Sequence, residues 1–149
     1  MDSGRTKRNL GRFGLMNILL DTHIILWALF KRENLSQRTI ELLSSEENTI
    51  FYSIASMWEI SVKHRKHPKQ ITRSGVEFMH YCEQMGFSKL PIEDRHVCSL
   101  ETLEQKEGYP EHEDPFDRIL LAQAKEDNMV FLTHDRMFLT YDEPNVFLV

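Results

Sequence analysis

The sequence predicts an α/β fold: one domain with a central, mainly parallel sheet flanked by helices. Three observations support this. The chain has 149 residues, the length of one domain. Hydrophobic residues make up 41% and charged residues 28%, a composition typical of a globular protein with a sizeable core. Short apolar runs rich in β-formers alternate with longer stretches of helical periodicity, the pattern of a parallel sheet covered on both faces.

The first element after a basic extension is a strand. Asn17–Leu20 is a short apolar run that ends at Asp21, as expected for a buried strand. Apolar residues then recur at helical spacing and predict a helix. Ser36 is a suitable N-cap for a second helix.

The middle of the chain repeats this alternation. Residues 49–52 (TIFY) predict a second strand, and Ser53 or Ser56 opens a helix that ends near Pro68. Trp58 lies in this helix at a spacing that is more typical of core than of base stacking. The same interpretation applies to Trp27 and Phe116.

Two further helices and a short strand follow. We expect a helix at 75–85 with Val76, Met79 and Cys82 on its buried side. Residues 87–92 predict a short strand interrupted by Pro91. Residues 94–103 predict a helix that buries Val97 together with the leucines three and six positions later.

The last part of the chain contains the clearest helix. Residues 104–113 are polar and predict a loop, whereas 115–127 predict a helix with a strongly apolar face. Residues 129–132 and 146–149 predict two more strands.

Charge is distributed unevenly along the chain. Residues 1–15 contain four basic residues and one acidic residue, so their net charge is +3. Because the whole chain has a net charge of −5, residues 16–149 have a net charge of −8. We interpret 1–15 as a disordered extension, with an RNA-contacting arm as the alternative, and 16–149 as the domain. The acidic body argues against a protein that binds duplex DNA through bulk positive charge. Two cysteines exclude a disulfide scaffold, and we expect a cytoplasmic protein without membrane spans.

Several carboxylates fall where strands end. Asp21 ends the first strand, Asp135 follows another, and Glu59 lies in the helix after the second strand. Asp114 and Asp117 begin the helix that precedes the Asp135 strand. Ligands of open α/β sheets bind at the carboxyl ends of strands, and oxygen-only ligands favour Mg²⁺ or Mn²⁺ over zinc.

Each carboxylate also has a purely structural interpretation. Asp21, Asp114 and Asp135 are all suitable helix N-caps, and Asp117 would favour the positive end of its helix. Glu59 would be a solvated residue, although it lies between Trp58 and Ile60 in an apolar stretch.

Four motifs resemble the PIN domain, in the branch of VapC-type toxins of type II toxin–antitoxin systems. They are 17–23 (NILLDTH) followed by Leu26-Trp27, 53–63 (SxxSxWEIxxK), 112–124 (HxDPFDR with AQA) and 132–135 (LTxD). The likeness covers residues 16–149 with the motifs in the correct order. It implies a PIN-like fold and a Mg²⁺-dependent endoribonuclease (Mn²⁺ is the alternative) that cleaves RNA and leaves 5′-phosphate ends.

The resemblance also assigns residues. Asp21, Glu59, Asp117 and Asp135 match the acidic catalytic quartet, and Asp114 matches an additional metal-binding aspartate. Thr22 and Thr133 match the small polar residues that support the first and last acids. Glu113 lies where this branch often has Arg, so it adds negative charge beside the site. The family further implies a homodimer and a small antitoxin partner that covers the site.

One basic cluster follows Glu59 along the chain. Its members include Lys63, Arg65 and Lys66, and they form either a solvated face or a phosphate track that leads to the metal. Arg118, beside Asp117, is either a phosphate clamp or the partner of a nearby carboxylate. Three histidines lie near the acids in sequence, and His112 is the one suited to orient the Asp114 loop.

The sequence lacks the motifs of two other classes of α/β protein with acidic sites. A phospho-receiver needs a late lysine, and a haloacid-type phosphatase needs D-x-D at the first strand; Asp21-Thr-His23 and the residues after Thr133 meet neither need. A stand-alone PIN ribonuclease without an antitoxin and a non-catalytic module of the same fold stay open.

Overall fold

A five-stranded sheet in the order β3-β2-β1-β4-β5, parallel throughout, lies at the centre of the protein. The computed structural model describes residues 15–149, so the extension predicted for 1–15 lies outside the described residues except for the exposed Leu15. The predicted α/β class and parallel sheet are confirmed. The strands are β1 (Asn17–Leu20), β2 (Thr49–Ser53), β3 (Ser88–Leu90), β4 (Val130–Thr133) and β5 (Val146–Leu148).

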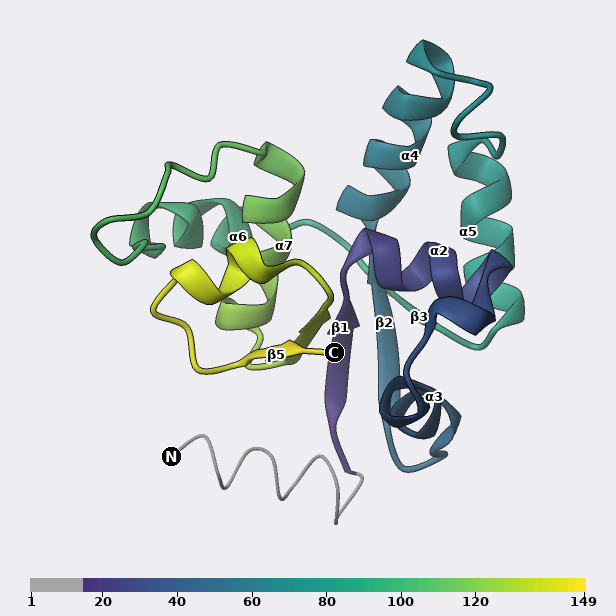
Figure 1. The fold of residues 1–149 in the computed structure, drawn as a ribbon, viewed down its shortest axis with the longest axis horizontal. Coiled ribbons are helices and arrows are strands. Elements are labelled where there is room, and N and C mark those ends of the chain that lie inside the picture. The colour runs from purple at the N-terminus through teal and green to yellow at the C-terminus, as the bar shows by residue number, and fades with distance from the viewer. Residues whose placement is uncertain (1–14) are drawn as a thin grey trace.

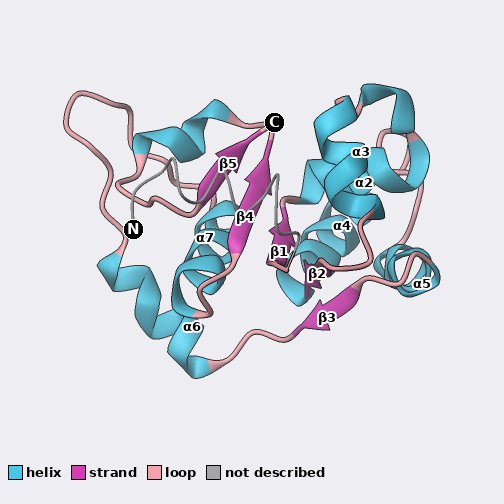
Figure 2. Cartoon of the chain, turned by 90° about the horizontal axis from the view of Figure 1, so that it is seen from below, coloured by secondary structure: helices cyan, strands magenta, loops and turns pink. Residues whose placement is uncertain are grey.

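Helices cover both faces of this sheet (Figures 1 and 2). One face carries α2 (Thr22–Phe30), α3 (Gln37–Ser44) and α5 (Gly75–Gln84), and the opposite face carries α6 (Asp94–Ser99) and α7 (Pro115–Glu126). Helix α4 (Ile54–Lys66) continues from β2 and packs against both α5 and α7. Within residues 15–149, three 3₁₀ turns complete the elements: η1 (Arg32–Asn34), η2 (Leu100–Thr102) and η3 (Arg136–Thr140).

Two apolar cores follow from the alternation of side chains along the strands. In β1, Ile18 and Leu20 join the core under α2 and α5, whereas Leu19 points into the core under α7. All three are fully buried, as the apolar run in the sequence predicted. Among residues 15–149, no helix combines the length and apolar character that a membrane span requires.

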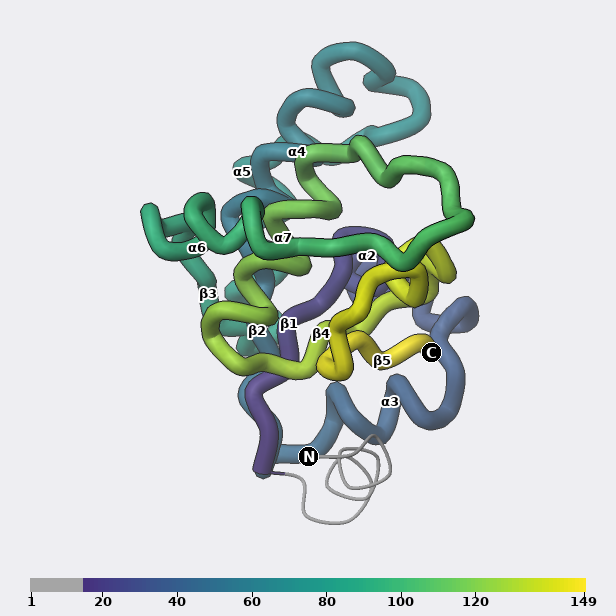
Figure 3. The backbone as a smooth tube through the Cα atoms, turned by 90° about the vertical axis from the view of Figure 1, so that its left-hand side faces the viewer, coloured from purple at the N-terminus to yellow at the C-terminus, as the bar shows by residue number. Residues whose placement is uncertain are grey.

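The predicted loop at 104–113 arches from η2 to the start of α7 and runs beside the segment after η3 (Figure 3). Its backbone pairs with that segment, because the amide of Lys106 donates to the carbonyl of Thr140 and that of Asp142 donates to Glu104. These bonds hold the loop against the domain and fix the approach to α7.

Three apolar residues that recur at helical spacing in the sequence are exposed in the structure. Val76 is 55% exposed in α5, which buries Gly75, Phe78 and Cys82 instead. Val97 is 51% exposed, because α6 turns His96 and Ser99 toward the interior instead, and the ring of His96 bonds to Asp127. Trp58 is 57% exposed rather than core, and it packs edge-to-face on Phe116.

Candidate active site

The predicted acidic residues converge at the carboxyl edge of the central strands. Asp21 follows β1 directly, and its backbone amide donates to the carbonyl of Leu132 in β4, which ties the two neighbouring strand ends together. Asp135 comes two residues after β4, and α4 begins where β2 ends. Parallel strands therefore bring residues more than a hundred positions apart to one place, as expected for this fold class.

Thr133 holds Asp21 and Asp135 together. Its hydroxyl donates to Oδ2 of Asp21 at 2.7 Å and accepts the amide of Asp135 at 3.0 Å. Asp21 is buried and also accepts the amide of Thr22 through Oδ1, whereas Asp135 is exposed and accepts the amide of Met137 through Oδ1. Both aspartates are thus helix caps and site residues at once, because each uses a single oxygen for the cap.

Glu59 lies buried against α2. Its Oε1 accepts the hydroxyl of Thr22 at 2.8 Å, and that hydroxyl also contacts Ser56 at 2.8 Å. Its Oε2 pairs with the ammonium of Lys63, one helical turn further, at 2.5 Å. The solvated interpretation of Glu59 is wrong: the side chain is held by two elements inside the site.

Asp114 and Asp117 stand at the start of α7. Oδ1 of Asp114 accepts the amides of Phe116 and Asp117, so the predicted cap forms. Oδ2 of Asp117 contacts Nε2 of His112 at 2.9 Å. His112 is buried between Phe138 and Tyr141, and its Nδ1 has no hydrogen-bond partner among the described residues. This favours the tautomer in which Nε2–H donates to Asp117, since an unpartnered acceptor costs less than an unpartnered donor.

Burial and mutual repulsion perturb these carboxyls strongly. Burial raises the pKa of Asp117 to about 8, and the charges of Asp21, Asp114, Glu59 and Asp135 add to the increase. Burial likewise raises the pKa of Asp21 to about 6, although the hydroxyl of Thr133 and the amide of Thr22 oppose this change. Such clusters of shifted acids are typical of functional sites.

The pKa shifts of His112 and Asp117 favour a hydrogen bond between uncharged partners over an ion pair. Burial lowers the pKa of His112, although Asp135 and Asp114 oppose that change, and the pKa of Asp117 is raised. Both directions favour the neutral forms near neutral pH. His112 therefore contacts Asp117 directly, across the turn that contains Asp114.

The donor set fits a hard divalent cation. All five acidic residues offer carboxylate oxygens, the ligands that Mg²⁺ and Mn²⁺ prefer. Among residues 15–149, the second oxygens of Asp114 and Asp135 and Oδ1 of Asp117 accept no hydrogen bond. Within the same residues, no three His, Cys, Asp or Glu side chains form a ready-made ligand group. The acids are near enough to raise one another's pKa, and a cation would remove that repulsion.

The predicted basic residues divide into two groups. Lys63 belongs to the site: burial lowers its pKa, but the bond and charge of Glu59, with the charges of Asp114 and Asp117, raise it overall. Arg65 and Lys66 are exposed at the end of α4. Arg118 is half-buried, and its Nη2 donates to the carbonyl of Leu100 at 3.4 Å.

Two contacts in the site were not predicted from the sequence. The contact of His112 with Asp117 bridges five residues and needs the loop before α7 to fold back. Ser53 donates to the buried Gln123 at 2.5 Å, and Gln123 in turn donates to the carbonyl of Pro91, so β2 and α7 are joined. In the sequence, only the position of a polar residue, Gln123, within an apolar helix face indicated that its side chain would need buried hydrogen-bond partners.

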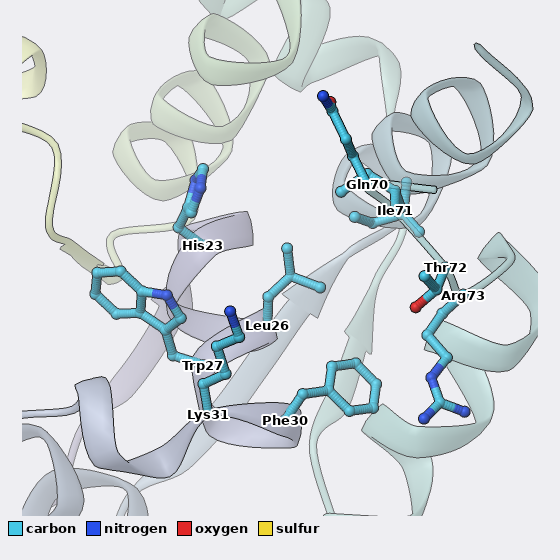
Figure 4. A pocket seen from close by; sticks show the side chains of 10 residues that line it. His23, Leu26, Trp27, Phe30, Lys31, Gln70, Ile71, Thr72 and Arg73 are labelled. Atoms are coloured by element: carbon cyan, nitrogen blue, oxygen red, sulfur yellow. The ribbon is translucent and has the colours of Figure 1, made fainter. Parts of the chain in front are cut away.

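Hollows lie next to His23 and Trp27 of α2. One, of about 320 Å³, runs between α2 and the segment that connects α4 to α5, and it is lined by Trp27, Phe30 and Ile71 (Figure 4). At its rim, the guanidinium of Arg73 lies 5.0 Å from the ring centre of Phe30. Another, of about 500 Å³, contains Asp21 and Asp135 themselves.

The site is thus a cluster of carboxylates at the carboxyl edge of a parallel α/β sheet, the edge at which such sheets bind their ligands. Residues 18–144 match the PIN domain family. The chain therefore belongs to the PIN domain family, as its motifs predicted. PIN domains are generally nucleases and typically use divalent metal ions.

Similar solved structures agree with this fold. A chain of the crystal structure of VapBC2 from Rickettsia felis, bound to a DNA fragment from their promoter, matches with a TM-score of 0.61 at 18% identity. The match covers 90% of this chain and 98% of that chain. No curated protein matches the sequence.

Proposed function

We propose that this protein is a Mg²⁺- or Mn²⁺-dependent endoribonuclease that acts as the toxin of a toxin–antitoxin pair in the cytoplasm. The observation that carries the nuclease activity is the convergence of Asp21, Glu59, Asp117 and Asp135 at one edge of the sheet, with two of their pKa values strongly raised. The toxin role rests on the VapC-type motifs and on the similarity to a VapBC2 structure.

The site would consist of carboxylates that hold a cation and of neighbouring side chains that orient them. Asp21, Glu59, Asp114, Asp117 and Asp135 would hold the cation, which supplies charge neutralisation and a water of lowered pKa when it is bound. Thr133 orients Asp21, Thr22 orients Glu59, and His112 orients Asp117. Lys63 balances the charge of Glu59 and lies where it can contact a phosphate of the RNA.

Binding of the rest of the strand would use the exposed basic residues. Arg65 and Lys66 follow Lys63 on α4 and offer charge outside the acidic centre. Arg118 is bonded to a backbone carbonyl and would have to leave that contact to clamp a phosphate. We therefore propose Lys63, Arg65 and Lys66 as the main phosphate contacts, with Arg118 as a weaker one.

Cleavage of single-stranded RNA by the purified protein tests the nuclease proposal. We expect cleavage with Mg²⁺ or Mn²⁺, none in EDTA, and at least a hundredfold loss in Asp117→Asn. Glu126→Gln is a matched control, because Glu126 is exposed at the far end of the same helix. Full activity of Asp117→Asn, or full activity in EDTA, would refute the metal mechanism. Absence of cleavage by the wild type with either metal would leave the non-catalytic module of the same fold.

An antitoxin that covers the site is the proposed partner. Trp58 is exposed, and Trp27 and Phe30 are half-buried along the 320 Å³ hollow, so a partner segment could bury apolar surface beside the acids. A basic side chain from that partner would replace the metal in the carboxylate cluster. Inhibition should then weaken as Mg²⁺ is raised.

Expression in cells separates the toxin from its alternative. A toxin stops growth when expressed alone and is neutralised by the product of a neighbouring gene. RNA cleavage without a growth defect or a binding neighbour would instead indicate a stand-alone PIN ribonuclease. We also propose that this protein is a homodimer in solution. Analytical ultracentrifugation measures this oligomeric state directly.

A further inference from the structure

A second feature lies beside the acids, at the start of α2 and the end of β4. It is a hollow of about 500 Å³, within the range of volumes of small-molecule sites. Its lining residues are Asp21, His23, Trp27, His134, Asp135 and Arg136. Because two of these are proposed metal ligands, whatever fills the hollow lies next to the reacting phosphate.

An aromatic wall bounds this hollow. The ring of His134 packs edge-on to the indole of Trp27, with centroids 5.0 Å apart, and His23 approaches the same indole at 6.1 Å. Nδ1 of His134 donates to the carbonyl of Val149 at 2.8 Å, which ties the ring to the end of β5. The half-buried Trp27 is thus held by His23, one turn earlier on the same helix, and by His134 from the segment after β4, so its indole is positioned at the hollow.

A cation also lines the hollow. Arg136 is exposed at the first position of η3, and it forms no ion pair among residues 15–149. The hollow therefore combines an aromatic wall, this guanidinium and the carboxylates of the cation site. A nucleotide carries the complementary groups, namely a flat base and a phosphate.

We propose that this hollow is a nucleotide subsite, in which a base next to the scissile phosphate stacks on Trp27 and a backbone phosphate contacts Arg136. The inference rests on the proposed ribonuclease function and names the substrate as single-stranded RNA. Only an unpaired base can leave its neighbours and stack on a protein side chain. Trp27 then selects for an unpaired nucleotide at this position rather than contributing only to the core.

Tryptophan fluorescence tests the contact directly, because the chain has two tryptophans. The background is Asp117→Asn with Trp58→Phe, which leaves Trp27 as the single fluorophore and keeps an aromatic ring against Phe116. A short single-stranded RNA is titrated in EDTA, beside a strand of equal length with abasic central positions. The matched control is Asp117→Asn with Trp27→Phe, which reports from Trp58 alone.

We expect RNA to quench Trp27 and to leave Trp58 largely unchanged. Removal of the stacking ring in Trp27→Leu should weaken RNA binding by about 5- to 150-fold, the range for loss of one stacked base. Arg136→Gln should lower the slope of log affinity against log salt by about 0.7, because one phosphate contact is lost from a single strand. Circular dichroism checks that each variant is folded.

Several results would overturn the proposal. Equal affinity for the abasic strand, or unchanged affinity of a folded Trp27→Leu protein, excludes stacking. If the wild type cleaves RNA in a metal-dependent way but RNA does not quench the fluorescence of Trp27, the ribonuclease function stands and the subsite is rejected. Absence of both cleavage and RNA binding, measured by anisotropy, rejects both. Quenching by the antitoxin but not by RNA assigns the hollow to the protein partner.

Discussion

The metal-free protein should lose stability as the pH rises, and Asp117→Asn should remove much of that loss. Asp117 and Asp21 have pKa values of about 8 and about 6 in the folded state, above the ordinary value of 3.8. A carboxyl whose pKa is raised by folding binds its proton more tightly in the native state. Its contribution to stability is therefore complete below about pH 4 and is lost as the pH rises through 6 and 8.

The magnitude follows from the shift. Between pH 6 and pH 8, a carboxyl with a folded pKa of about 8 loses up to about 2 kcal/mol of stability, at about 1.36 kcal/mol per pKa unit. The Asp117 side chain is 18% exposed, so solvent screening reduces this to about 1–2 kcal/mol. For a domain of this size, that corresponds to a Tm lower by about 2–8 °C. The amide side chain introduced by Asp117→Asn cannot ionise, yet it can still bond to His112.

Thermal unfolding in EDTA at a series of pH values measures this effect. We expect the Tm of the wild type to fall more steeply than that of Asp117→Asn, and the variant to be the more stable protein at pH 8. Glu126→Gln, an exposed change of the same charge on the same helix, should follow the wild type. Mg²⁺ should raise the Tm of the wild type far more than that of Asp117→Asn. Parallel pH profiles of wild type and Asp117→Asn would refute the electrostatic reasoning.

Substitutions at three further positions test the supporting structure. Thr133→Val leaves Oδ2 of Asp21 and the amide of Asp135 without their partner, so we expect about 1–3 kcal/mol lower stability in urea unfolding and weaker cleavage. Asp114→Ala should cost about 1 kcal/mol more than Asp114→Asn in the same assay, because Asn also caps a helix. Gly75→Ala should cost about 1–3 kcal/mol, because the added Cβ would clash with the Ser61 side chain and lie 3.1 Å from the carbonyl of Met57. A Gly75→Ala protein as stable as the wild type would show that α4 and α5 can separate there.

Local patterns were sufficient where a residue's role depends on its neighbours in sequence. The apolar run before Asp21 predicted a buried strand, and β1 is buried from Ile18 to Leu20. Asp114-Pro115 predicted the cap and start of α7, because capping uses only the backbone amides that follow. Strand ends followed by acids predicted one acidic edge, since parallel strands all end on the same side.

Tertiary packing decided what the local pattern left open. Val76 and Val97 have the spacing of core residues but are exposed, because helical periodicity defines an apolar stripe without defining which neighbour covers it. Trp58 is exposed and Trp27 is half-buried in a hollow, although both fit a core pattern.

The chemistry of the site shows the same division. The sequence by itself determined which carboxylates are available and at which edge of the sheet they lie. Only the tertiary structure decided their charge state, because the pKa of Asp117 depends on its burial and on four other acids, three of them from distant segments of the chain. The pairing of His112 with Asp117, and the contact of Glu59 with Thr22, depend on distances that exist only after these segments have packed together.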